Sequence, residues 1–192
     1  MQTNSVLISP YGEKLVNLIC SNDQISELKS ITTKLNSIQL SERSMCDFEM
    51  MSIGAFSPID RFMSKNDYES VIETQRLSNG TLFPIPITLP IHSTDGIELD
   101  HQIAIRSPKN DLLATMTVEE IYECDHKLAA LKVFGTNDSK HPMVADMDTW
   151  GKYNVSGTIQ TIQIPSYNDF IELRLTPAET RRRLDEFGYE NV

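Results

Sequence analysis

The sequence predicts an α+β fold, in which helices pack on a sheet. Residues 25–35 and 45–53 carry apolar side chains every three or four positions, which is the spacing of one helix face. Residues 97–106, 112–122 and 155–164 are strand-like, because they alternate in character or are rich in β-branched side chains. Both kinds of element therefore contribute to the predicted core.

The composition is that of a globular protein with one full core. The chain has 192 residues, of which 40% are hydrophobic and 23% are charged. Domains cluster at roughly 100–150 residues, so we expect one domain and a piece of a second. The charge of −10 repels polyanions, and we predict no nucleic-acid partner.

Targeting and redox signals are sparse. No apolar run approaches the ~20 residues of a membrane span, so no membrane partner is predicted. The start, MQTNSVLISP, lacks the features of a secretion signal, which predicts a cytoplasmic protein. Cys20, Cys46 and Cys124 form no CxxC pair, so we expect reduced, buried thiols.

The first quarter of the chain predicts two helices. After an extended start and a turn at residues 11–14, residues 15–20 form a short β-like run. Ser21, Asn22 or Asp23 can then cap a helix that faces the core. Residues 38–40 are interpreted as a link, and Ser41 or Ser44 caps a second helix that ends at Gly54. We expect the methionines here to fill the core, namely Met45, Met50, Met51 and, beyond the helix, Met63.

The next stretch contains a turn, a helix and a proline-rich strand. Residues 56–58 form the turn, and Asn66 or Asp67 can cap a helix with Tyr68, Val71 and Ile72 on one face. Asn79-Gly80 closes that segment as a turn. Residues 81–89 read as a strand with an edge or exit role, since its two prolines cannot donate to a ladder.

A hairpin and a further strand follow. Residues 97–106 and 112–122 form the hairpin. Asp125 caps a short helix that carries Leu128, Leu131 and Phe134 and ends at Gly135. After the polar loop NDSKHP, residues 155–164 form a strand with a bulge at Gly157, and Pro165 stops it.

We place a domain boundary at residues 166–169, which gives one domain over residues 1–167 and the truncated start of another over residues 168–192. Thr176-Pro177-Ala178-Glu179 combines an N-cap, a proline at the first helical position and a capping box. The helix is expected to run to Phe187 and stop at Gly188. We interpret it as the first helix of a missing α/β domain whose first strand would follow Val192.

The order of motifs resembles one enzyme family over almost the whole chain. FSPIDRFM, DYESVIETQRLSNGT and FPIPITL are similar to the amino-terminal domain of ATP sulfurylases (sulfate adenylyltransferases), and so, in the same order, are SPYGEKLVNL, LSERSMCDFEMMSIGAFSP, MTVEEIY, FGTNDSKHPMVADM and ELRLTPAETRRRL. Two departures are Arg61 and Phe83, where some members have Gly and Trp.

The resemblance implies a PUA-like mixed β pseudo-barrel with flanking helices, followed by the first helix of a missing α/β nucleotidyltransferase domain. The parent enzyme would join ATP and sulfate into adenosine 5′-phosphosulfate with release of pyrophosphate, and would use Mg-ATP. The family's nucleotide-binding motifs would begin beyond Val192. The chain is therefore expected to be structural and inactive alone, without a cofactor of its own, and its implied partners are its own catalytic domain and a second subunit.

No residue is predicted to be catalytic, cofactor-binding or metal-ligating. His92, His101 and His126 are isolated and expected at the surface, and His141 is interpreted as a hydrogen-bonding loop residue. The acidic pairs Glu119-Glu120 and Asp146/Asp148 lack a third convergent ligand, so we interpret them as solvated. Residues 181–183 are three arginines that point about 100° apart on a helix, which favours a charged face paired with Glu179, Asp185 and Glu186.

Two other functions remain open at this point. PUA-like folds elsewhere bind RNA, so the chain could be a free-standing RNA-binding module, although its acidic charge and the lack of an aromatic and arginine platform argue against it. A small hydrolase is the third hypothesis, and it is disfavoured because no nucleophile, base and orienting residue can be assigned.

Overall fold

The computed structural model describes residues 7–188, which form a mixed five-stranded half-barrel sheet with flanking helices. The predicted α+β class is confirmed. The strands are β1 (Ser37–Gln39), β2 (Pro90–Ile91), β3 (Gln102–Arg106), β4 (Leu112–Glu123) and β5 (Tyr153–Thr161). The helices are α1 (Asn22–Ile31), α2 (Glu42–Ser52), α3 (Lys65–Thr74), α4 (His126–Phe134), α5 (Pro142–Met147) and α6 (Pro177–Glu186), with the short 3-10 helices η1 (Thr32–Lys34) and η2 (Ile171–Leu173).

The sheet has the order β1-β3-β4-β5-β2, with β4 near its centre. The pairs β3–β4, β4–β5 and β5–β2 are antiparallel, whereas β1 is parallel to β3. The predicted hairpin is confirmed as β3 and β4. A register shift lies between Val118 and Glu120, so the extra residue of the bulge is Glu119 and Gly157 stands opposite. Gly157 is required there, because a Cβ would lie 2.0 Å from the carbonyl oxygen of Thr117.

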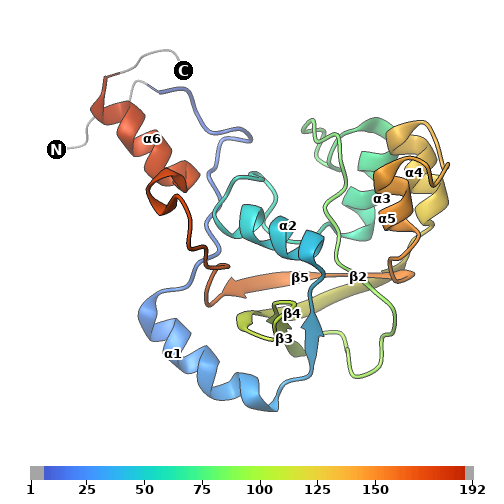
Figure 1. The fold of residues 1–192 in the computed structure, drawn as a ribbon, viewed down its shortest axis with the longest axis horizontal. Coiled ribbons are helices and arrows are strands. Elements are labelled where there is room, and N and C mark those ends of the chain that lie inside the picture. The colour runs from blue at the N-terminus through green and yellow to red at the C-terminus, as the bar shows by residue number, and fades with distance from the viewer. Residues whose placement is uncertain (1–6, 189–192) are drawn as a thin grey trace.

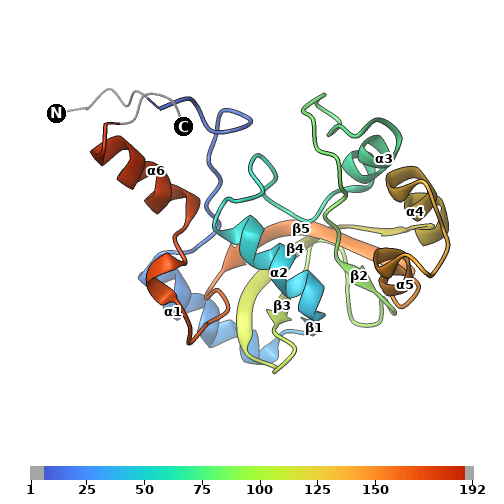
Figure 2. The same ribbon diagram turned by 45° about the horizontal axis from the view of Figure 1, so that its top comes forward.

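The helices cover the sheet in separate groups. Figures 1 and 2 show α2 against one face, α1 along the opposite side, and α3, α4 and α5 gathered at one end. The core includes Phe48 and Met51 of α2 and Leu113, Met116 and Val118 of β4, which are at most 1% exposed. Helix α6 stands apart from this body beside the N-terminal segment (Figure 1), and none of its residues is buried.

The helix termini follow the predicted capping chemistry at most positions. Ser21 caps α1, Ser41 caps α2, and Asp125 and Gly135 bound α4. The cap of α3 was predicted wrongly: Ser64 accepts from the backbone N–H of Asp67, while the Asp67 carboxylate accepts from the N–H and hydroxyl of Ser78. The Asp67 side chain therefore binds the turn that follows α3 and does not cap the helix.

Several predicted strands differ in extent. Residues 38–40 are not a plain link, since Ser37–Gln39 pair with β3 as an edge strand. Residues 81–89 form no strand of the sheet, because Pro84 and Pro86 provide no N–H for a ladder. The chain joins the sheet only after them, at Pro90–Ile91. Residues 15–20 contribute a single bridge from Ile19 to Thr161. β3 begins at Gln102 rather than at the predicted Ile97. The polar loop before Pro142 leads into helix α5, and this helix was not predicted.

Some predicted core positions are exposed. Met51 and Met63 are buried, but Met50 is 39% exposed and Met45 is half-buried. In α4 the buried residues are Ala129 and Ala130, while the predicted face has Leu128 and Leu131 at the surface. Of the three cysteines, Cys46 is exposed and the other two are half-buried, so the prediction of buried thiols is wrong for Cys46.

Candidate interaction surface

The most exposed large apolar side chains gather near the two ends of the described chain. Five are 65–72% exposed, namely Ile8, Phe170, Ile171, Leu173 and Phe187, whereas the other large exposed apolar residues are 38–56% exposed. We call residues 166–188, which contain four of these five, the tail segment. Because exposed apolar surface can mark an interaction site, we take the tail segment as the candidate interaction surface.

Local chemistry builds the helix of the tail segment. Thr176 accepts from the N–H of Glu179, and the Glu179 carboxylate accepts from the N–H and hydroxyl of Thr176. This is the predicted capping box, with Pro177 at the first helical position. The hydrogen bonds from Thr176 lower the pKa of Glu179. The helix ends at Glu186, one residue before the predicted end at Phe187, and Gly188, where the helix was predicted to stop, has φ +69°.

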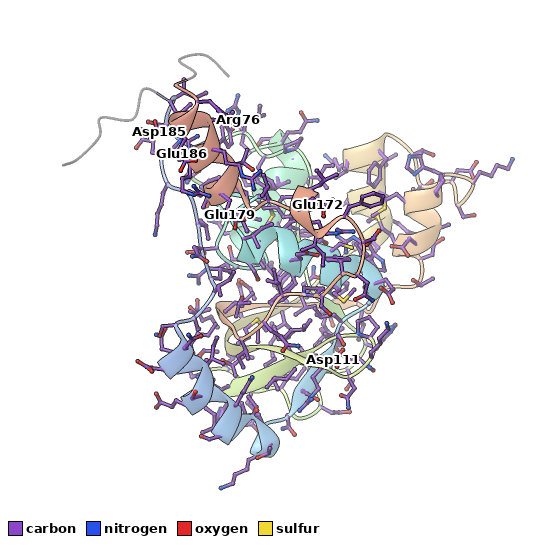
Figure 3. The ribbon with its side chains drawn as sticks, turned by 60° about the vertical axis from the view of Figure 1, so that its left-hand side comes forward. Arg76, Asp111, Glu172, Glu179, Asp185 and Glu186 are labelled. Atoms are coloured by element: carbon purple, nitrogen blue, oxygen red, sulfur yellow. The ribbon has the colours of Figure 1, made fainter. Side chains whose placement is uncertain are left out.

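Two of the three consecutive arginines, Arg181 and Arg182, have different partners. Arg182 pairs with Glu186 one turn later, and Arg181 donates to the carbonyl of Ile8. The prediction of a charged helix face is confirmed for Arg182, whereas Glu179 serves the cap rather than an arginine. Figure 3 shows Glu179, Asp185 and Glu186 on α6. Arg181 and Arg182 therefore do not converge on one anion.

The tail segment is attached to the body through Tyr167. Its hydroxyl donates to the Glu49 carboxylate on α2, across a separation of 118 residues. The guanidinium of Arg174 lies 3.7 Å from the centroid of the Tyr167 ring. Arg174 also donates to the carbonyl and the carboxylate of Asp169, both at 3.2 Å. The bond to Glu49, followed by burial, raises the pKa of Tyr167 to about 12.

A cleft of about 330 Å³ separates α2 from the tail segment. It is lined by Glu49, Ile53 and Ile164 on the side of the body and by Tyr167, Ile171 and Arg174 on the side of the tail. A second cleft, of about 530 Å³, lies between the start of α2 and the β3–β4 turn, where Asp111 is labelled in Figure 3. Ile164, Pro165 and Tyr167 line both clefts, so the stretch that leads into the tail segment lies between them.

The histidines do not form a site. His92 and His101 are exposed, as predicted. His126 is half-buried instead, because it opens α4, where its Nε2 lies 2.8 Å from the carbonyl of Gly151 and its ring meets Trp150 edge to face. His141 is the N-cap residue of α5, and its ring stacks on Phe134 at 5.0 Å rather than making the expected side-chain hydrogen bond.

Three of the four residues in the acidic pairs have structural partners. Glu119, at the bulge, accepts from Arg61 and from the hydroxyl of Thr158, and Glu120 accepts from the N–H of Lys65 at 2.8 Å. The Asp146 carboxylate accepts from the Trp150 indole at 3.0 Å. Within residues 7–188, no three His, Cys, Asp or Glu side chains converge in a way that could hold a metal ion.

The comparisons place this geometry in a family. The model of the PUA-like domain matches residues 8–164, and the chain belongs to this family. The chain is also similar to sulfate adenylyltransferases: it is 36% identical to that of Gibberella zeae over 191 residues, covering 96% of this chain and 33% of the relative. The enzyme of Yarrowia lipolytica is 37% identical over 191 residues, with 96% and 33% covered. The predicted resemblance is confirmed.

Two further matches agree on the covered region. The sulfate adenylyltransferase of a Synechococcus strain is 32% identical over 194 residues, covering 100% of this chain and 49% of the relative. A solved structure described as a hexameric APS kinase from Thiobacillus denitrificans superimposes with a TM-score of 0.73 and 27% identity, covering 95% of this chain and 32% of that chain. The chain thus spans about a third to a half of the length of these relatives.

None of the helices within residues 7–188 is long and apolar enough to span a bilayer.

The sequence indicated the tail helix but not its attachment. The capping box and the apolar residues of α6 are visible as local patterns, so the predicted exposed helix could be found. The contacts of Tyr167 with Glu49 and of Arg181 with Ile8 join residues 118 and 173 positions apart. No local pattern predicts such pairs, and neither pair was predicted.

Proposed function

We propose that this chain is the N-terminal structural domain of a sulfate adenylyltransferase and that its tail segment packs against the catalytic domain of that enzyme. The observation that carries the proposal is the match to sulfate adenylyltransferases over nearly the whole chain, although it spans only a third to a half of their length. The exposed apolar residues of the tail segment support it, because they lie where a second domain would follow a boundary near residue 167.

We assign no Mg-ATP site to the described residues. Magnesium needs carboxylates together with substrate phosphates, and no acidic cluster within residues 7–188 could hold a metal. A phosphate site needs converging donors, whereas Arg181 and Arg182 have separate partners. In this proposal the adenylyl transfer to sulfate and its Mg-ATP belong to the rest of the enzyme, and no step of the reaction is assigned to this chain.

The RNA-binding alternative has less support. The chain carries a formal charge of −10, which opposes binding to a phosphate backbone. The cation–aromatic pair of Arg174 and Tyr167 is engaged with Glu49 and Asp169 rather than presented as a stacking platform. A structural role therefore agrees better with the charge and the contacts of these residues than RNA binding does.

We further propose that the parent enzyme is cytoplasmic and forms oligomers. The solved relative is described as hexameric, which supports the second proposal. Light scattering of the assembled enzyme measures its oligomeric state, and a monomer at micromolar concentration would contradict it. Fractionation of the source cells tests the first proposal, and we expect the enzyme in the cytoplasmic fraction.

A chimeric enzyme tests the proposed function. In it, this chain replaces the aligned third of the Gibberella zeae relative, and sulfate-dependent exchange between ATP and pyrophosphate is measured. We expect exchange from the chimera and only background from the chain alone or from the remainder of the relative alone. Exchange by the chain alone would contradict the structural role, and an inactive chimera whose remaining part still binds ATP would contradict the family role.

A further inference from the structure

We propose that Tyr167, Glu49 and Arg174 form a latch that holds residues 166–174 in one conformation, so that Phe170, Ile171 and Leu173 face outward for docking. The name latch refers below to Tyr167, Glu49 and Arg174. The inference rests on the proposed function for the identity of the docking partner, namely the catalytic domain of the same polypeptide. The latch itself concerns contacts within this chain.

The contacts of the latch close a loop of the tail segment on itself and on the body. Tyr167 is joined to Glu49 of α2, while Arg174, seven residues later, covers the Tyr167 ring and bonds Asp169. Charge-assisted hydrogen bonds and an arginine stacked on an aromatic ring are both directional contacts. The segment between Tyr167 and Arg174 is therefore fixed at both ends.

The backbone at Phe170, between Tyr167 and Arg174, is strained. Phe170 has φ 47° and ψ 40°, which is the left-handed region that a bulky residue rarely adopts. Such a conformation persists only when surrounding contacts impose it. The backbone around Phe170 is fixed by Arg174 through Asp169, and by the bond from the Leu173 N–H to the Phe170 carbonyl at 2.9 Å. The strain indicates that the latch imposes this conformation.

The consequence for docking is pre-organisation. Phe170, Ile171 and Leu173 are 65–72% exposed although they lie in a short ordered helix. Ordering a flexible loop on binding costs conformational entropy, which a pre-formed loop has already lost. The latch thus favours docking of the catalytic domain without contacting that domain itself.

Amide hydrogen exchange in the chain alone tests the latch. The amides of Leu173 and Arg174 are informative, because both donate within η2, at 2.9 and 3.1 Å. Tyr167→Phe removes the hydroxyl and leaves the ring under Arg174. We expect these two amides to exchange about three- to tenfold faster, as follows from losing a partly exposed bond to a charged group.

Tyr11→Phe is the matched control. It also removes one tyrosine hydroxyl bond, from Tyr11 to the carbonyl of Leu82 at 2.7 Å, but outside the latch. We expect it to leave the two tail amides within twofold of the wild type. The core amide of Val155, which donates to the Leu89 carbonyl at 3.0 Å, should be unchanged in both variants. Faster exchange of that core amide in Tyr167→Phe would show global destabilisation and overturn the inference.

A second variant shows whether the residues act together. Glu49→Ala should accelerate the tail amides by a similar factor, and the double variant with Tyr167→Phe should be no faster than either single variant, because one bond cannot be lost twice. Independent, multiplicative effects would overturn the latch, as would a Tyr167→Phe variant that behaves like Tyr11→Phe. These measurements use the chain alone, so an inactive chimera with a responsive latch would reject only the proposed function.

Discussion

Leu173→Ser should weaken the docking of the tail segment without weakening the fold of the chain itself. Leu173 is 72% exposed in this chain. Full burial of a leucine side chain stabilises by about 1.5–3 kcal/mol, so burying the exposed part at a domain interface is worth about 1–2 kcal/mol. This corresponds to a change of roughly 5- to 30-fold in the equilibrium between docked and undocked tail.

Trypsin measures this equilibrium in the chimeric enzyme. Arg181, Arg182 and Arg183 are cleavage sites in α6, and a docked helix is cut only when it opens. When reclosing is faster than cleavage, the cleavage rate follows the population of the open state. We therefore expect Leu173→Ser to raise the rate of cleavage at these arginines roughly 5- to 30-fold.

Leu131→Ser is the control, because Leu131 is 49% exposed on α4, which lies on the other side of the molecule from α6 (Figure 1). It should leave the cleavage rate of the chimera unchanged. In the chain alone, Leu173→Ser should change the free energy of unfolding by less than about 0.5 kcal/mol, as surface substitutions usually do. Equal cleavage of the Leu173→Ser and Leu131→Ser chimeras would refute the docking of this surface.

Three further predictions concern the chain alone. Limited proteolysis should cut α6 at Arg181, Arg182 and Arg183 faster than elsewhere and leave a compact body; an α6 as resistant as the body in dilute monomer would show that the boundary is misplaced. Mobility-shift assays with mixed RNA at physiological salt should detect no binding, because of the −10 charge, and salt-sensitive submicromolar binding would revive the RNA-binding hypothesis. Ser52→Ala should destabilise the body by about 1–3 kcal/mol, since it removes the buried partner of the Thr161 hydroxyl at 2.9 Å. The double variant with Thr161→Val should recover part of that loss, and additive losses in urea unfolding would contradict this.

Elements with local signals could be predicted from the sequence. The capping box at Thr176 and the pair of Asp125 and Gly135 around α4 satisfy backbone groups within one turn, so their sequence spacing determines the structure. The β3–β4 hairpin is equally local, since a five-residue turn joins its strands. In each case the residues that fix the element lie within it.

Elements that depend on distant partners could not be predicted. β1 is three residues long and exists because Ser37–Gln39 pair with β3 more than sixty residues away. The predicted strand over residues 81–89 failed for the opposite reason, since its prolines prevent a ladder along most of its length. Ser64 caps α3 in place of Asp67 because a turn eleven residues later takes the aspartate. The latch is of the same kind, because Glu49 and Tyr167 meet only in the folded chain.

The contrast between the body and the tail segment supports the proposed role. Helix α6 is ten residues long and buries none of them, and an isolated helix of that length is marginal in water even for favourable sequences. The helix is stabilised by its capping box, by the pair of Arg182 with Glu186 and by the bond from Arg181 to Ile8. Each of these contacts contributes only a modest free energy, because it lies on an exposed surface. Apolar burial, which stabilises most helices in proteins, is the contribution that α6 lacks here. A second domain that covers α6 and its C-cap residue Phe187 would supply it, and a latch that already orients the preceding segment would reduce the entropy lost when it does so.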